Sequence, residues 1–384
     1  MTRPRLVLIT NIPTPYRVYL YHQIHNACES RDIAFEVWFM DKSEPGRFWD
    51  INPDEWAFTG EILPGFHFTI RRIPVHINPQ AWLKLIRKPP TWLFTSGWQL
   101  PTNIGAYWLP LRHTYNLMWA EANMNASRQK EGPIARYRKL ALEKCDAIVI
   151  PGQIARETIL DHWQVNPQSL LYLPNLVDET HFRETVTRLR LNKRDLCEQY
   201  GLSDAKKVLY WSARLNDQAK GITKFLDIVD DLPLTILLAG DGQDRPKIET
   251  WAKEHPDFDL RILGHVPQNE VLQYMAMSDV AILPSISDPN PLSMIEAIWS
   301  GLPVLASTHN GNWPETVAPN ENGWLVNPLD EASVRKAVAE IVGSDREHLV
   351  QMGHASQELA KKNFDSEQKV MQFIDSLLEQ FPPH

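Results

Sequence analysis

The feature that most limits the fold of this chain is an alternation of short apolar segments with longer amphipathic ones, which occurs twice. In the first half, the strand-like segments Arg5–Asn11 (RLVLITN) and Ala34–Met40 (AFEVWFM) flank the helix-like segment Tyr16–Cys28. The second half repeats this order, from Lys207–Leu215 (KVLYWSARL) to Pro303–Ser307 (PVLAS). Strands that alternate with helices form parallel sheets covered by helices. The sequence therefore predicts an α/β protein with two Rossmann-like, doubly wound domains that face each other across a cleft.

The length of 384 residues also favours two domains, because a single core of that size would be unusually large. We place the first domain at residues 1–178 and the second at 179–364. The boundary follows the segment LPNLVDETHFRE, in which a strand gives way to a polar, proline-bearing stretch. Residues 365–384 contain a final helix, about Ser366–Gln380, that no strand follows. This helix is free to pack on either domain, the first included.

The amino-acid composition argues against several classes of protein. The formal net charge of -8 argues against a nucleic-acid partner, because nucleic-acid binders usually carry a basic surface. Three scattered cysteines indicate neither a disulfide framework nor a zinc site, and they fit a reducing compartment. The N-terminal apolar run is too short for a signal peptide, and no later run is long enough to span a membrane. We therefore expect a cytoplasmic protein that acts on small molecules.

Ligands of open parallel sheets bind beyond the carboxyl ends of the strands, and polar groups gather at such places in the second half. Arg214 and Lys220 follow a predicted strand and suit a diphosphate, since arginine can bind two oxygens at once and lysine supplies a mobile charge. The alternative is that both form surface ion pairs. The glycine-bearing exits AGDG, which contains Gly242, and GHVP, which contains His265 and Val266, would let a flat ring approach the backbone.

The segment SISDPNPLSMIEAIWSGLPVLAS predicts a helix that begins at Pro291, with Asn290 as its N-cap. The free N–H groups at such a helix start attract anions. Asp288 lies in the loop before the helix, and Glu296 lies on its second turn. Glu296 is able to accept two ribose hydroxyls, although a solvated helix residue is an equally open interpretation.

Several of these segments together resemble a known family. ARLNDQAKG, AGDG, SDVAILPSISDPNPLSMIEAIWSGLPVLAS and HNGNWPETV…NGWLV look like the C-terminal domain of the group 1 glycosyltransferases, which are retaining, use nucleotide sugars and have the GT-B fold. KCDAIVIPG and LPNLVDETHF resemble the last N-domain strand of that family and its interdomain crossing. The resemblance runs in order from about Asp146 to Val326 and is weaker over the first 140 residues.

The resemblance implies roles for individual residues. Arg214 and Lys220 would hold the donor diphosphate and stabilise the leaving group as its charge develops. Asp288 and Glu296 match the two acids of the family's E-x7-E motif, with aspartate in place of the first glutamate. Asp288 would contact the transferred sugar, and Glu296 would contact the ribose. The family uses a nucleoside-diphosphate sugar as co-substrate and needs no other cofactor and no metal.

The chain also departs from the family pattern. It has Asn290-Pro291-Leu292 where the family usually has Phe-Gly-Leu, so Leu292 and Ser293 must supply the backbone N–H groups. NIPTPYR stands in place of a Gly-Gly loop and directs three residues at an acceptor or a phosphate, namely Thr14, Tyr16 and Arg17. LMWAEAN offers Glu121 where a histidine is expected, and we take Glu121 as a catalytic or acceptor contact, with a purely structural role as the alternative.

Other features carry weaker hypotheses. Trp98 lies at a strand exit in TSGWQLPT and is a candidate acceptor platform, although core packing is the commoner use of tryptophan. PQAWLKLIRKPPTW would suit a membrane surface and a lipid-linked acceptor, but its short length favours a helix that feeds a strand. The thirteen histidines show no spacing typical of metal ligands. Peripheral membrane contact is therefore left open but is not indicated.

The sequence thus favours a retaining glycosyltransferase that moves a sugar to a glycan or another small acceptor in polysaccharide or glycoconjugate biosynthesis. One alternative is a nucleotide-sugar epimerase, which would convert its donor without an acceptor. Another is a non-catalytic nucleotide-sugar-binding or scaffold protein derived from such an enzyme. The presence of all four polar residues Arg214, Lys220, Asp288 and Glu296 disfavours that second alternative. The sugar, the base and the acceptor are not specified by these residues.

Overall fold

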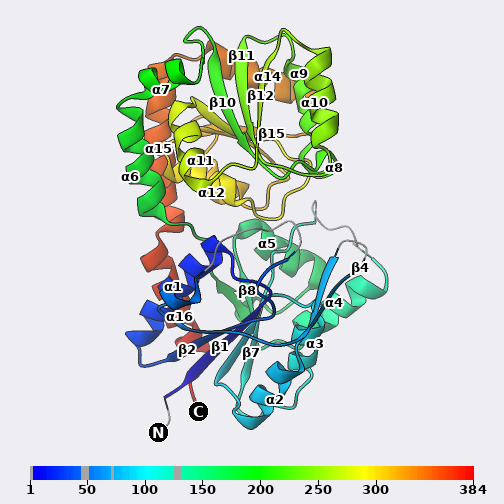
Figure 1. The fold of residues 1–384 in the computed structure, drawn as a ribbon. Helices are drawn as coiled ribbons and strands as arrows, with labels where there is room; N and C mark the ends of the chain where they lie inside the picture. The colour runs from blue at the N-terminus through cyan, green and yellow to red at the C-terminus, as the bar shows by residue number, and fades with distance from the viewer. Residues whose placement is uncertain (1–2, 45–51, 71–72, 125–130) are drawn as a thin grey trace. The chain divides into compact units, whose positions relative to one another are not determined.

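The computed structural model describes residues 3–44, 52–70, 73–124 and 131–384 of the chain (Figure 1). The chain separates into two compact units. The first contains Met1–Val177 together with Ser366–His384, and the second contains Asp178–Asp365. Each unit is built on one main parallel sheet with helices on both of its faces.

The main sheet of the first unit has seven parallel strands in the order β3-β2-β1-β6-β7-β8-β9. Their bounds are β3 (Thr59–Ile62), β2 (Ala34–Phe39), β1 (Arg5–Thr10), β6 (Trp92–Thr95), β7 (Tyr115–Trp119), β8 (Ala147–Ile150) and β9 (Leu170–Tyr172). Every residue of β6 and β8 is buried, as expected of central parallel strands that are covered on both faces. A separate antiparallel hairpin joins β4 (Phe66–Ile70) to β5 (Ile73–Ile77).

Helices cover both faces of this sheet. They are α1 (Pro15–Glu29), α2 (Pro79–Arg87), α3 (Pro101–Tyr107), α4 (Pro133–Glu143), α5 (Gln153–Glu157) and α16 (Ser366–Gln380). Short helical turns lie at Pro53–Glu55, Thr158–His162 and Pro167–Ser169. α1 and α16 lie side by side although they come from opposite ends of the chain (Figure 1).

The position of α16 follows from its apolar face. Val370, Phe373, Ile374 and Leu377 recur at helical spacing and are all buried. The ring of Phe373 lies 6.1 Å from that of Phe94 on β6. The last helix of the chain therefore completes the core of the first unit.

The sheet of the second unit has six parallel strands in the order β12-β11-β10-β13-β14-β15. They are β12 (Asp259–Gly264), β11 (Leu234–Ala239), β10 (Lys207–Ser212), β13 (Val280–Leu283), β14 (Val304–Ser307) and β15 (Gly323–Val326). Its helices are α6 (Glu179–Arg190), α7 (Lys193–Gln199), α8 (Asp217–Lys220), α9 (Ile222–Val229), α10 (Arg245–Glu254), α11 (Gln268–Met277), α12 (Leu292–Trp299), α13 (Trp313–Thr316), α14 (Glu331–Gly343) and α15 (Arg346–Phe364). The predicted α/β class with two doubly wound sheets is confirmed.

Some local predictions were wrong. β3 and the β4–β5 hairpin were not among the predicted strands. The segment NIGAYWLPLRH, whose pattern predicts a helix throughout, is helical only as far as Tyr107, where α3 ends, because Pro110 cannot continue a helix. α12 begins at Leu292 with Pro291 as its N-cap, so Asn290 is not the cap and Pro291 is not the first helical residue. In the part of the chain that the structure describes, no helix has the length and apolar character needed to cross a membrane.

Candidate functional site

The strand order of the second sheet reverses at β10. Successive strands β11 and β12 lie on one side of it, and β13, β14 and β15 lie on the other. Such switch points are where doubly wound sheets bind ligands, because the loops leaving the two neighbouring strands diverge there. The loop after β10 carries Arg214, and α8, which follows it, ends with Lys220. The loop after β13 carries Asp288. The fold therefore brings two predicted donor-binding residues, Arg214 and Lys220, and the predicted catalytic residue Asp288 to one edge of the sheet.

Lys220 and Asp288 form an ion pair at this edge, between side chains that are only 14% and 12% exposed. The two loops are also joined by their backbones, since the N–H of Ser287 donates to the carbonyl of Ala219 at 2.9 Å. Arg214 lies nearby in sequence, but its side chain is exposed. A basic and an acidic side chain are thus held together in a largely water-excluded position.

The loop that carries Asp288 is braced from the next strand. The N–H of Gly311 donates to the Asp288 carbonyl at 2.9 Å, and the Asn310 amide donates to the carbonyl of Leu283 at 2.9 Å. The Asn312 amide donates to the carbonyl of Pro291 at 2.8 Å, at the start of α12. These asparagines belong to the HNGN segment, which forms part of the family resemblance but was not predicted to carry site residues. Their function in the loop depends on contacts that their spacing does not reveal.

The start of α12 has no side-chain cap. The backbone N–H of Asn290 donates to the Asp288 carboxylate at 3.3 Å. Pro291, the N-cap, has no polar side chain, so the first turn of α12, with Leu292 and Ser293, has no side-chain cap. Uncapped N–H groups at a helix start favour an anion. The helix ends as predicted, with Gly301 in the left-handed conformation at φ 67° directly after the C-cap.

Glu296 lies on the second turn of α12, and burial raises the pKa of its carboxyl from 4.5 to about 7. Among the described residues, none donates a hydrogen bond to this carboxylate. A buried acid without a partner is costly in its charged form. A ligand hydroxyl group that donates to Glu296 would lower that cost, which supports the predicted contact with a ribose.

We expect the folding stability of the nucleotide-free chain to depend on pH because of the raised pKa of Glu296. Between pH 4.5 and about 7 the folded state keeps a proton on Glu296 that the unfolded state has lost, so rising pH destabilises the fold through this residue. Glu296→Gln removes the effect and should therefore gain stability relative to the parent chain across this window, by up to about 3 kcal/mol. Melting temperatures of both proteins measured from pH 4 to 8 check the prediction. Parallel curves would place the Glu296 pKa near its ordinary value.

The exit of β11 approaches the loop after β10 closely. A Cβ atom on Gly242 would lie 2.4 Å from the carbonyl oxygen of Leu215, and one on Gly240 would lie 1.9 Å from that of Ala213. The N–H of Leu215 donates to the Asp241 carbonyl at 3.0 Å. Glycine is therefore required for this packing, which fixes the loop that carries Arg214.

Gly242→Ala should push the loop after β11 away from the loop after β10, which contains Leu215. We expect it to destabilise the chain by about 1–3 kcal/mol through overpacking. Gly343→Ala is the matched control, because a Cβ at Gly343 meets no atom within 4 Å. Urea unfolding of both variants measures the difference. Equal midpoints would show that the loops can separate without cost.

His265 and Val266 follow β12 directly, after Gly264 in a left-handed conformation at φ 71°. The carbonyl of Gly264 accepts the N–H of Gly240 at 2.7 Å, which places this exit beside that of β11. His265 is exposed and Val266 is partly exposed. Both side chains are accessible at the same sheet edge as Gly242, as their candidate role requires.

The strand order of the first sheet reverses between β1 and β6, because β2 and β3 extend the sheet on one side and β7, β8 and β9 extend it on the other. Arg17, on the first turn of α1, donates to the Tyr16 hydroxyl at 3.0 Å, and its guanidinium lies 5.6 Å from the centre of the Trp119 ring at the end of β7. Burial opposes the charge of Arg17, but the hydroxyls of Tyr16 and Tyr21 and the carboxylate of Glu121 favour it, so its pKa lies above the ordinary value. The structure therefore brings Arg17 and Glu121 into one electrostatic neighbourhood.

Glu121 accepts a hydrogen bond from the amide of Asn175 at 2.9 Å. Asn175 is almost fully buried and follows β9, in the LPN segment that was not predicted to carry a site residue. Thr14, the N-cap of α1, is also buried, and its hydroxyl has no hydrogen-bond partner among the described residues. Trp98 packs against the core cluster that contains Met118 and Ala122. Its ring packs against Tyr137 at 5.9 Å and lies under the Arg138 guanidinium at 4.8 Å.

Comparisons with known proteins find similarity in sequence and in fold. Residues 192–359 match the family described as glycosyl transferases group 1. N-acetyl-alpha-D-glucosaminyl L-malate synthase of Bacillus anthracis is 25% identical over 61% of this chain and 60% of its own length. An uncharacterized glycosyltransferase of Methanocaldococcus jannaschii is 25% identical over 60% of this chain and 65% of its own length. The chain thus aligns with less than two thirds of either relative.

A solved structure extends the similarity to the whole fold. Alr3699/HepE of Anabaena, in complex with UDP, superposes with a TM-score of 0.75 at 13% sequence identity, over 98% of this chain and all of that one. At this identity the likeness concerns the fold. Residues 192–359 therefore resemble the group 1 glycosyl transferases, and the chain has the same fold as the GT-B structure of Alr3699/HepE.

Proposed function

We propose that this chain is a retaining glycosyltransferase that moves a sugar from a nucleoside-diphosphate sugar to a hydroxyl group of a glycan or another small acceptor. The observation that carries the proposal is the pairing of Lys220 with Asp288 at the switch point of the second sheet, beside the uncapped start of α12. A cation and free N–H groups suit a diphosphate, and a carboxylate suits the sugar that departs from it.

In the proposed reaction, the bond between the anomeric carbon and the diphosphate oxygen breaks while a bond to the acceptor oxygen forms on the same face of the sugar. The proton of the acceptor hydroxyl passes to the departing diphosphate oxygen, so no side chain is needed to remove it. Lys220, Arg214 and the first turn of α12 stabilise the negative charge that develops on the leaving group. Asp288 stabilises the positive charge that develops on the sugar ring. The donor therefore supplies both the transferred sugar and the oxygen atom that accepts the proton.

The first unit contributes acceptor recognition in this proposal. The charge of Arg17 is favoured by Tyr16, Tyr21 and Glu121, and Glu121 is held in place by Asn175. Together they can bind an acceptor that offers both an anionic group and a hydroxyl. The Thr14 hydroxyl and the Tyr16 phenol are further candidate contacts. Trp98 is a less direct candidate, because its ring already packs against Tyr137 and Arg138.

We place the reaction in glycoconjugate or polysaccharide biosynthesis. The Bacillus anthracis relative is named for joining a sugar to malate, a small hydroxylated carboxylate, which accords with an acceptor that carries an anionic group. The proposal assigns no metal to the reaction, since Lys220, Arg214 and a helix N-terminus supply the positive field.

A panel of UDP, GDP, ADP and dTDP sugars, tested with and without hydroxylated acceptors, distinguishes the functions. A transferase releases nucleoside diphosphate and does so faster with its acceptor. An epimerase changes the donor sugar without release. A binding protein raises its melting temperature with a nucleotide but leaves every donor intact. Either of the last two results would replace the transferase proposal.

A further inference from the structure

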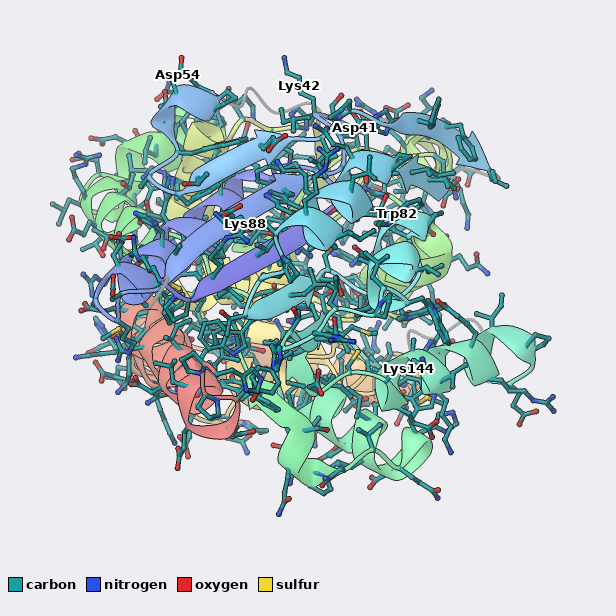
Figure 2. All side chains as sticks on the ribbon, turned by 90° about the horizontal axis from the view of Figure 1, so that it is seen from below. Asp41, Lys42, Asp54, Trp82, Lys88 and Lys144 are labelled. Atoms are coloured by element: carbon teal, nitrogen blue, oxygen red, sulfur yellow. The ribbon has the colours of Figure 1, made fainter. Side chains whose placement is uncertain are left out.

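We propose that the first unit binds one Zn²⁺ ion between the end of β2 and the β4–β5 hairpin, through Asp41, His67 and His76. This site is independent of the proposed transferase function. Asp41 lies two residues beyond Phe39, the last residue of β2 (Figure 2). Of the described residues, only these three form a group with potential ligand atoms close enough for one metal ion, all within 4.8 Å of one another.

The distances between the potential ligand atoms fit a metal of this size. The two histidine Nδ1 atoms lie 3.0 Å apart, and the Asp41 Oδ2 atom lies 3.5 Å from that of His67 and 3.8 Å from that of His76. Tetrahedral coordination with bonds of about 2.0–2.1 Å separates neighbouring ligand atoms by about 3.3 Å. Three atoms at such separations occupy one face of a tetrahedron, and the fourth position lies open for water.

A carboxylate behind His76 supports the assignment. The Nε2 atom of His76, on the opposite side of its ring, lies 3.4 Å from the carboxylate of Glu44, which is itself largely buried. Glu44 also accepts a hydrogen bond from the Asn11 amide at 2.8 Å. A histidine that binds metal through one nitrogen commonly donates its other N–H to a carboxylate, which fixes the ring and its tautomer. Glu44 is thus placed to leave the Nδ1 atom of His76 unprotonated for a metal.

The surrounding fold holds these groups in position before any metal arrives. His67 and His76 face each other directly across the hairpin. The buried Asn78 amide donates to the carbonyl of Met40 at 2.8 Å, which ties the residue before Asp41 to the residue that follows β5. The Thr102 hydroxyl donates to the carbonyl of His76 at 3.0 Å. The site therefore requires little rearrangement to bind an ion.

The hairpin itself gives a physical reason for such an ion. A two-stranded hairpin outside a larger sheet is marginally stable. β4 also exposes Phe66, Phe68 and Ile70, which contribute little burial to hold it. A metal that bridges β4, β5 and the end of β2 would secure the hairpin to the main sheet. Without a metal, the two histidines and Asp41 would form only a hydrogen-bonded cluster.

The test uses the full, tag-free chain, stripped with chelator and then titrated with Zn²⁺ or Co²⁺. We expect one equivalent of bound metal, a rise in melting temperature with Zn²⁺, and the strong visible absorption of four-coordinate Co²⁺. Slower amide hydrogen exchange in β4 and β5 should accompany binding. A wild-type chain that takes up no metal, or that shows only the weak absorption of hexa-aqua Co²⁺, would overturn the proposal.

Variants assign the ligands. His67→Gln alters the most accessible ligand with little risk to folding and should abolish stoichiometric binding. Glu44→Gln, which changes a positioning residue, should weaken Zn²⁺ about 10–100-fold and leave the Co²⁺ spectrum of the bound form tetrahedral. His348→Gln on α15 is the control, because it removes an exposed histidine outside the cluster and should bind like the parent chain. Equal affinity in His67→Gln and His348→Gln would exclude the cluster as the site.

Discussion

Asp288→Asn is expected to lower the turnover of the preferred nucleotide sugar by about 100–1000-fold, the loss typical of removing one group that stabilises transition-state charge. The substitution keeps the shape of the side chain and removes its charge. That charge matters most when the sugar ring becomes cationic, so kcat should fall while the affinity for nucleoside diphosphate is kept or rises. Affinity can rise because Lys220 loses its internal partner and becomes available to the diphosphate.

Steady-state release of nucleoside diphosphate and calorimetric binding of the same nucleotide measure the two effects separately. Asp257→Asn is the matched control, because Asp257 is exposed in the turn before β12, at the amino end of that strand. The control should keep both parameters. Turnover in Asp288→Asn at the parental rate would remove Asp288 from the reaction, and an equal loss of affinity and turnover would assign it to donor binding alone.

Lys220→Ala is expected to weaken nucleoside diphosphate binding about 10–100-fold, because a hydrogen bond to a charged group contributes about 1.5–3 kcal/mol. It should also destabilise the nucleotide-free chain by about 1–3 kcal/mol, since it removes the ion pair with Asp288 at a position where the Asp288 side chain is only 12% exposed. Thermal shifts with and without nucleotide report both effects in one experiment.

A double-mutant cycle separates the two consequences. Lys220→Ala combined with Asp288→Asn removes the uncompensated charge, so much of the lost stability should return while nucleotide affinity stays low. Lys224→Ala is the control, because Lys224 lies on the neighbouring helix α9 and pairs with Glu331 at a more exposed position. Additive losses of stability in the double variant would show that the ion pair is energetically irrelevant.

The sequence by itself determined the local elements and the class of fold. Arg5–Thr10 and Val304–Ser307 form strands because runs of apolar residues must be buried on both faces of a sheet. The predicted bounds of the last helix, Ser366–Gln380, are those of α16, because the spacing of its apolar residues is helical. Gly301 ends α12 because only glycine readily adopts the left-handed conformation. Each of these features depends on residues that are close together in the chain.

The tertiary structure decided which side chains meet. Lys220 and Asp288 are 68 residues apart, and they pair because β10 and β13 are neighbours in the sheet. Glu121 and Asn175 are 54 residues apart and meet beyond the ends of β7 and β9. Their spacing in the sequence carries no sign of either contact, because strand order is set by how the whole sheet packs.

The cluster of Asp41, His67 and His76 is the clearest example of contacts that spacing in the sequence does not reveal. The spacing of the histidines suggested no ligand set, and the β4–β5 hairpin was not predicted because its exposed apolar residues resemble neither a buried strand nor a helix. Antiparallel pairing places His67 opposite His76, and the Asn78 side chain ties that hairpin to the end of β2. Apolar periodicity records which face of a segment is buried. It cannot record which polar side chains a distant segment will bring to the same place, since that depends on long-range packing and on hydrogen bonds made only in the folded chain.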